Sequence, residues 1–160
     1  MTEPASVEDR LAAAGIELPA PLAPLSAHVP VVVSRGLVFV SGHGPLDPER
    51  VPIYAGAVGR ERTEAEGYAA ARLSMLNVLA SLKQEFGNFD RVARVVRLTG
   101  YVLSAPGFQR QPWVTDGASD LLVEAFGAER GQHARTSVGV VVSALDMTVT
   151  VDTIFELEDA

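Results

Sequence analysis

The 160-residue sequence contains no cysteine. Disulfides, thiolate metal sites and thiol nucleophiles are therefore excluded. Its three histidines, His28, His43 and His133, show no metal-ligand spacing and have no acidic cluster beside them, so we expect no metal site. No glycine-rich loop is followed by a lysine, which argues against a phosphate cradle for a nucleotide. We expect the protein to hold no cofactor.

The sequence also lacks an excess of basic residues and a long apolar run. It has 13 Lys and Arg against 20 Asp and Glu, which gives a formal net charge of −7. A nucleic-acid-binding protein normally carries a basic patch that neutralises phosphates, so a nucleic-acid partner is disfavoured. No segment approaches the length of a membrane span, and the N-terminus lacks the pattern of a secretory signal. We expect a cytoplasmic protein with no membrane partner.

What is present fits one domain, since 48% of the residues are hydrophobic and the length is that of an ordinary domain. Residues 6–14 predict a short helix with Ser6 as its N-cap and Gly15 as its stop. Residues 18–30 are rich in proline and predict an extended lead-in. We therefore divide the chain into an N-terminal helix with its lead-in, residues 1–30, and a single domain, residues 31–160.

The domain is expected to be an α+β fold in the order β-β-α-β-α-β-β. The capping box Thr63 to Glu66 opens a helix that Gly87 ends. A second helix is expected over residues 115–126, ended by Gly127, and both helices should pack on one face of the sheet. The expected strands are 31–33 and 37–41 as a hairpin, a short edge strand at 53–58, then 92–104, 136–144 and 148–158, with a tight turn at 145–147.

Several of these strands are apolar on both faces, and residues 92–104 are the longest example. A strand that is apolar on both faces is usually buried on both faces. Two helices cover only one of them, so we predict an oligomer whose sheets pack against each other.

Arg135 is the leading candidate for a functional residue. It opens an apolar run, Thr136-Ser137-Val138-Gly139-Val140-Val141-Val142, at the start of a predicted strand. A guanidinium stays charged and offers a planar fork that matches a carboxylate, and its burial is costly unless an anion meets it. Either a small acidic ligand or a structural carboxylate would satisfy it.

Two further pairs of residues are candidates for a functional role beside Arg135. Thr150 and Asp152 share one face of the last strand, and we expect them near Arg135 because the preceding strand should fold back beside the last one. Asp152 would then neutralise Arg135 or orient a water molecule, and the first role is slightly favoured. Ser41 and His43 share a face at a strand end, where a small-residue turn is a better interpretation than a nucleophilic pair.

Taken together, three stretches resemble the YjgF/RidA family, also known as endoribonuclease L-PSP. They are Leu37–Pro45, the helix with Asn77, and His133–Val140. The segments Val95–Val102, Gly107-Phe108 and Gly117–Gly127 are similar to its longer-chain, YjgF/chorismate-mutase-like branch. The likeness covers about residues 16–158.

This resemblance implies a chorismate-mutase-like fold and a homotrimer with pockets between subunits. It implies that Arg135 holds the carboxylate of a small imino acid, which is hydrolysed to a 2-keto acid and ammonia without a cofactor. The backbone near Ser137 and a glutamate on the last strand would position the attacking water. Ser41, Gly42, His28 and Asp120 are the further expected ligand-binding residues, His28 at the family's aromatic position and Asp120 at that of a pocket-lining Asn.

The sequence departs from the family pattern at the residue that would act as the general base. The glutamate position falls on Thr150, and a hydroxyl cannot replace a carboxylate as a general base. Asp152 lies two residues further along the strand, roughly 6–7 Å away. Hydrolysis of an imino acid and binding or sensing of a carboxylate without turnover therefore stand as equal hypotheses, and a ribonuclease is disfavoured.

Overall fold

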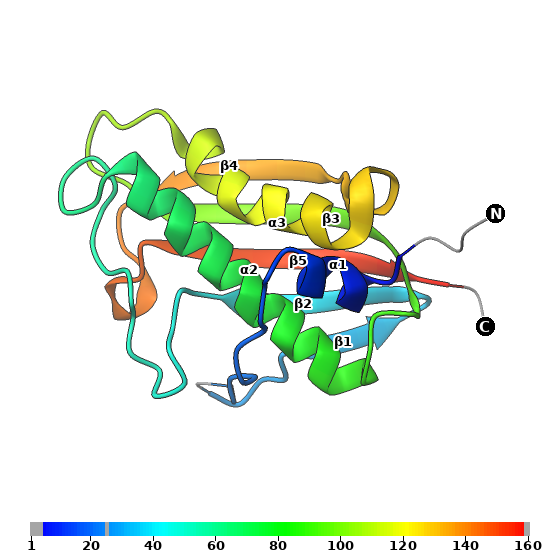
Figure 1. Ribbon diagram of the computed structural model, residues 1–160. Coiled ribbons are helices and arrows are strands. Elements are labelled where there is room, and N and C mark those ends of the chain that lie inside the picture. The colour runs from blue at the N-terminus through cyan, green and yellow to red at the C-terminus, as the bar shows by residue number, and fades with distance from the viewer. Residues whose placement is uncertain (1–4, 25, 159–160) are drawn as a thin grey trace.

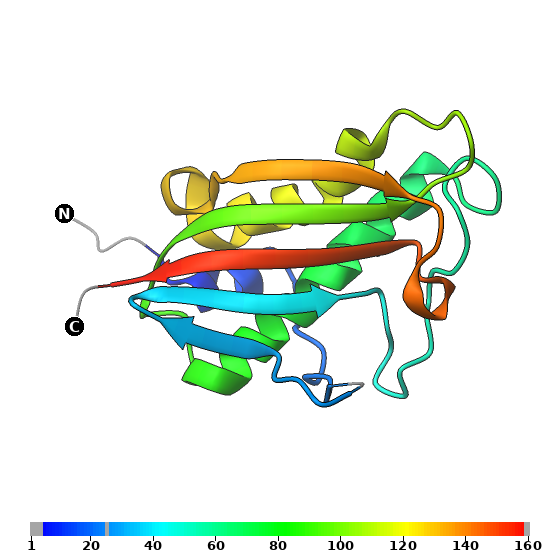
Figure 2. The same ribbon diagram turned by 180° about the vertical axis from the view of Figure 1, so that it is seen from behind.

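The sheet has five strands in the order β1-β2-β5-β3-β4 (Figures 1 and 2). The structure is a computed structural model that describes residues 5–24 and 26–158. All neighbouring strands run antiparallel except β3 and β4, which are parallel. The strands are β1 Val31–Ser34, β2 Leu37–His43, β3 Val92–Leu103, β4 Ala134–Val140 and β5 Val149–Leu157.

In the described part of the chain, the helices lie on one face of this sheet (Figure 1), and the other face carries no helix (Figure 2). The helices are α1 Val7–Ala13, α2 Glu64–Phe86 and α3 Gln111–Gly131. Ser6 caps α1 and a capping box opens α2 at Thr63, as the sequence predicts. The structure adds a capping box between Ser6 and Asp9 in α1. Gly87 ends α2 with a φ of 82°. None of the helices in the described part of the chain is long and apolar enough to cross a membrane.

The third helix is longer than the predicted segment 115–126. It begins at Gln111, with Pro112 in its first turn, where the missing N–H costs nothing. Gly127 interrupts the helix with a φ of 77° and a ψ of 165°, so the predicted stop is a real break in the helical backbone. One more turn follows it, up to Gly131, because glycine lets the chain change direction there and resume.

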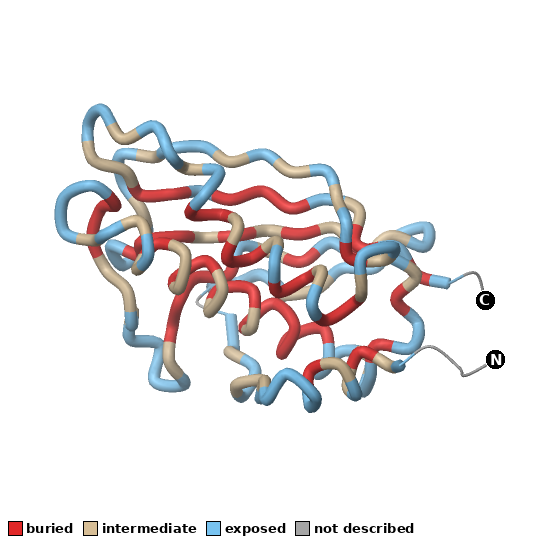
Figure 3. Tube along the Cα trace, turned by 45° about the horizontal axis from the view of Figure 1, so that its top comes forward, coloured by how far each residue is buried: buried red, intermediate tan, exposed pale blue. Residues whose placement is uncertain are grey.

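The hydrophobic core lies between the helices and the sheet (Figure 3). Met75 and Leu79 of α2, Leu121 of α3, Leu98 of β3 and Phe155 of β5 are fully buried. Each such side chain stabilises the fold by about 1.5–3 kcal/mol relative to an exposed position. Val7 and Leu11 belong to the same cluster, so α1 is part of this core.

The expected strand at residues 53–58 is wrong. Only isolated bridges form there, Ala55 with Met147 and Val58 with Arg62 and Ser104. Gly56 has a φ of 104°, and its N–H donates to the Asp146 carbonyl at 2.8 Å. This positive φ bends the chain out of the extended conformation, so the segment runs as a loop along the end of the sheet.

The expected hairpin of the last two strands is also wrong. β5 lies between β2 and β3, while β4 pairs with the far side of β3. The sequence from β3 through α3 to β4 forms a crossover, which places β4 parallel to β3. The chain then passes through a short 3-10 helix, Ala144–Asp146, to reach the centre. β5 takes the central place because one of its faces is fully buried, whereas β4 carries polar side chains that suit an edge.

The uncovered face of the sheet mixes apolar and polar side chains. Val32, Phe39, Tyr101 and Val138 are between 37% and 48% exposed, while Asp152 lies on the same face. The expectation of two apolar faces therefore holds only in part. Self-association across this face stays a prediction.

Candidate functional site

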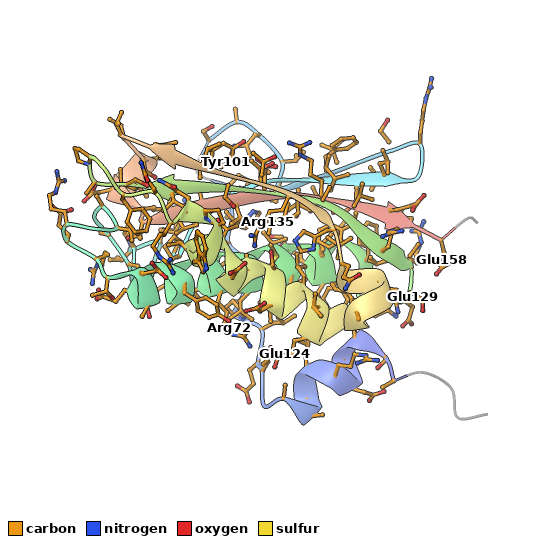
Figure 4. The ribbon with its side chains drawn as sticks, turned by 90° about the horizontal axis from the view of Figure 1, so that it is seen from above. Arg72, Tyr101, Glu124, Glu129, Arg135 and Glu158 are labelled. Carbon is orange, nitrogen blue, oxygen red and sulfur yellow. The ribbon has the colours of Figure 1, made fainter. Side chains whose placement is uncertain are left out.

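Arg135 points from β4 toward the helices. Its register partner on β3, Leu98, is fully buried under α3, and Figure 4 shows Arg135 on the helix side of the sheet. Nη1 donates to Asp116 Oδ1 at 2.6 Å and to Ser119 Oγ at 3.0 Å, both on α3. The Arg135 side chain is 24% exposed. The guanidinium is thus held in place by its own subunit.

The carboxylate that meets Arg135 is neither Asp120 nor Asp152. It is Asp116, whose side chain is 41% exposed. Within residues 5–24 and 26–158, both hydrogen bonds of the guanidinium leave from Nη1. Nε and Nη2 therefore keep their donors for another acceptor. One half of Arg135 is a structural ion pair, and the other half is available.

A chain of hydrogen bonds with fixed directions continues from Arg135. The Gly131 carbonyl can only accept, so Nδ1 of His133, 2.7 Å away, carries a hydrogen. In the neutral ring Nε2 then accepts from the Ser119 hydroxyl at 3.0 Å, and Ser119 Oγ accepts from Arg135. Burial, together with the charge of Arg135, lowers the pKa of His133. The neutral histidine thereby orients the serine that holds the arginine.

Ser137 lies two residues beyond Arg135 on the same face of β4. Its hydroxyl is buried, and it has no hydrogen-bond partner in the described part of the chain. A buried hydroxyl without a partner costs free energy that a ligand or water molecule can recover. Ser137 therefore belongs with Arg135 as a potential ligand contact.

Thr150 and Asp152 lie far from Arg135, contrary to the sequence-based expectation. β3 separates the two strands, and Thr150 is the register partner of Tyr101, which Figure 4 shows on the uncovered side of the sheet. A β-carbon added at Gly42 would come 3.1 Å from Thr150 Cγ2, so these two residues adjoin. A hydrogen bond to the Asp152 carboxylate is the main cause that raises the pKa of Tyr101.

A separate cavity of about 80 Å³ lies at the end of β2 and is lined by Ser41, Gly42 and His28. His43 also lines this cavity. Its Nδ1 is 2.7 Å from the Ser41 carbonyl, and its Nε2 is 2.8 Å from Ser81 Oγ. The ring contacts the backbone of Ser41, so these contacts do not form the nucleophilic pair considered from the sequence. Desolvation by burial lowers the pKa of His43.

Asp120 lies on the outer side of the helices. It accepts a hydrogen bond of 2.9 Å from the Tyr68 hydroxyl of α2. Both residues line a surface hollow with Trp113 and Asp116. Asp120 therefore adjoins the Arg135 cluster through Asp116, while its own hydrogen bond points to α2.

The structure thus separates the predicted residues into two groups. Arg135 and Ser137 form one on the helix side, with Asp120 beside it, while His28, Ser41, Gly42 and Thr150 form the other around the end of β2. Sequence reasoning missed Asp116, Ser119 and the role of His133. The spacing of Asp116 and Ser119, three residues apart on a helix, places them on one face, but only the crossover fixes that face against β4. No cluster of three or more His, Asp or Glu side chains in residues 5–24 and 26–158 is placed to hold a metal ion.

Comparison with known proteins places this fold and these residues in a family. Residues 8–157 match the family described as "YjgF/chorismate mutase-like, putative endoribonuclease". The chain belongs to this family and has its chorismate-mutase-like α+β fold.

Individual relatives agree with this assignment. The protein TCP17 of Trypanosoma cruzi is 41% identical over 145 residues, which are 91% of this chain and 90% of TCP17. A crystal structure from Shewanella oneidensis, described as a "putative endoribonuclease", has a TM-score of 0.90 at 37% identity and covers 96% of this chain and 100% of that one. Atu1372 from Agrobacterium tumefaciens, of unknown function, has a TM-score of 0.85 at 34% identity, with 95% and 92% covered.

A more distant structure with the same fold is E. coli TdcF with bound serine. Its TM-score is 0.58 at 19% identity, and it covers 88% of this chain and 94% of TdcF.

Proposed function

We propose that this protein binds a small carboxylate at Arg135, in a pocket that a neighbouring subunit of a homotrimer completes. The observation that carries the proposal is the free half of Arg135. Nη1 is fixed by Asp116 and Ser119, which orients Nε and Nη2 before a ligand arrives. A carboxylate matches those two donors as a bidentate partner, and a preoriented guanidinium loses little entropy on binding it.

The position of Arg135 supports a pocket between subunits. β4 is an edge strand, so its outer side is open to a second chain. Thr150 and Gly42 lie on other strands, with Thr150 on the opposite side of the sheet from Arg135. Only a second subunit can therefore bring Thr150 and Gly42 close to Arg135. The serine bound to TdcF, which has the same fold, is a small molecule with a carboxylate.

Binding without turnover fits the geometry better than imine hydrolysis. Thr150 offers no base at the position where the family resemblance expects a glutamate. One observation favours hydrolysis as the second candidate: Tyr101 of β3, the register partner of Thr150, has a pKa raised mainly by Asp152, which lies two residues beyond Thr150 on β5. These two side chains would supply an acid and a carboxylate beside Thr150. The two candidates differ in one measurable product, ammonia.

The test is calorimetric titration with 2-oxobutyrate and with serine. Arg135→Ala should weaken binding by about tenfold to a hundredfold, because charge-assisted hydrogen bonds contribute about 1.5–3 kcal/mol. Arg72→Ala is the matched control, since Arg72 also pairs with a carboxylate of α3, Glu124 at 2.6 Å, on the outer side of the helices (Figure 4).

Equal affinity of the Arg135→Ala and wild-type proteins would refute the proposal. Ammonia release from freshly generated 2-iminobutyrate, above buffer and dependent on Asp152, would establish the hydrolytic candidate instead. Loss of that release in Asp152→Asn but not in Arg72→Ala would assign it to the Tyr101 and Asp152 pair.

A further inference from the structure

The hydrogen-bonded cluster of Arg135, Asp116, Ser119 and His133 has no net charge as long as His133 is neutral. Asp116 already neutralises the guanidinium at 2.6 Å. An arriving carboxylate therefore meets an ion pair without net charge and leaves the cluster with one negative charge. Because the Arg135 side chain is 24% exposed and that of Asp116 is 41% exposed, the excess negative charge is only partly solvated and opposes binding.

His133 is placed to supply the missing positive charge. Protonation at Nε2 turns that atom from an acceptor into a donor toward Ser119, 3.0 Å away. A serine oxygen has two lone pairs, so it can accept from His133 and Arg135 together while its own hydrogen turns to another acceptor. Rotation of one hydroxyl thus accommodates both protonation states. Burial and the charge of Arg135 oppose the proton, so the pKa of His133 is lowered.

Other charged side chains lie in the neighbourhood of His133. Arg94 of β3 and Glu156 of β5 line a hollow with it, and these two are cross-strand partners of opposite charge. Arg130 of α3 donates to backbone carbonyls of β3. The charges of Arg94 and Glu156 have opposite signs, so their effects on His133 offset each other. Among these residues, His133 has the kind of side chain that ordinarily changes charge between pH 5 and 8.

We propose that His133 takes up a proton when a carboxylate binds at Arg135, so that the site binds an anion and a proton together. This proposal rests on the proposed function. His133 acts as a positioning residue, since it reaches Arg135 through Ser119 and does not contact the ligand. The positive charge of Arg135 lowers the affinity of His133 for a proton, and the negative charge of a bound carboxylate raises that affinity again. By reciprocity, the proton on His133 strengthens the binding of the carboxylate.

The test counts protons. Calorimetric titration of 2-oxobutyrate in two buffers of equal pH but different ionisation enthalpy gives the number taken up per carboxylate bound. Uptake should approach one proton per carboxylate. In the pH range where binding takes up a proton, the affinity should rise by up to about tenfold for each unit that the pH falls. His133→Gln should abolish the uptake and flatten this dependence.

Arg72→Ala is the matched control. Arg72 also pairs with a carboxylate of α3, Glu124 at 2.6 Å, but on the outer side of the helices (Figure 4). Uptake should persist in Arg72→Ala. A second variant, Asp116→Asn, leaves the charge of Arg135 uncompensated, so it should bind 2-oxobutyrate more tightly than wild type at pH 8 and without proton uptake.

Three outcomes would overturn the proposal. They are binding by the wild type without proton uptake between pH 5 and 8, undiminished uptake in His133→Gln, or undiminished uptake in Asp116→Asn. Binding that Arg135→Ala abolishes, but that involves no proton, would overturn this coupling and leave the proposed function intact. Absence of binding at every pH would overturn both.

Discussion

At the scale of single residues, two histidines are held in place by backbone carbonyls and serines. His43 is 8% exposed, and its lowered pKa means that the unfolded chain binds a proton before the folded one does. Its contribution to stability is therefore complete above about pH 6.5, the ordinary value, and is lost as the pH falls from there through the lowered folded pKa. His133 acts in the same direction.

The corresponding prediction concerns the free energy of unfolding between pH 8 and pH 5. Urea unfolding should show a loss of stability on acidification, and His43→Gln should make that loss smaller because the titrating group is gone. The exposed His28 is the comparison: its charge is the smallest of the three causes that act on the pKa of His43, so His28→Gln should reduce the loss much less than His43→Gln. A pH dependence that is unchanged in His43→Gln would contradict the assignment of this loss to His43.

At the scale of elements, the contact between α2 and α3 depends on one glycine. A β-carbon added at Gly117 would lie 2.0 Å from the Tyr68 carbonyl oxygen and 3.2 Å from the Arg72 backbone nitrogen. Backbone atoms cannot move aside as a side chain can. This close approach of the two helices also sets where Asp116 and Ser119, on either side of Gly117, meet β4.

Gly117→Ala should therefore destabilise the protein by about 1–3 kcal/mol, a typical cost of overpacking, despite the roughly 1 kcal/mol that alanine gains over glycine in a helix. Gly67→Ala is the control, because the three atoms nearest to its added carbon belong to valine side chains, at 3.0–3.2 Å, and not to the backbone. Urea unfolding of both variants makes the comparison. A Gly117→Ala protein as stable as wild type would show that the helices separate without cost.

At the scale of the whole molecule, one face of the sheet has no covering element in the described structure, and it exposes Phe39 at 42% and Val32 at 48%. We predict that this face associates with further copies of the chain, so light scattering should give the mass of three chains. Phe39→Glu should lower that mass by placing a charge in the interface. Val51→Glu, an exposed position outside the strands, is the control. A monomeric wild type at micromolar concentration would contradict the trimer.

The sequence by itself determined the local structure and the leading residue. Ser6, Thr63 and Gly87 mark helix ends because capping and positive φ depend on nearby residues, and the charge of Arg135 among apolar neighbours singles it out wherever its strand lies. Periodicity also identified the strand-forming segments in β2, β3 and β5.

Only the tertiary structure decided the order of the strands and the partners of Arg135. A hairpin and a crossover have similar alternation in sequence, and the choice depends on which strand gains more from burial at the centre. The apolar β5 takes that place and displaces β4 to the edge, which separates Thr150 from Arg135 and brings α3 over β4. Asp116, Ser119 and His133 therefore meet Arg135 through contacts between segments that no local pattern in the sequence encodes.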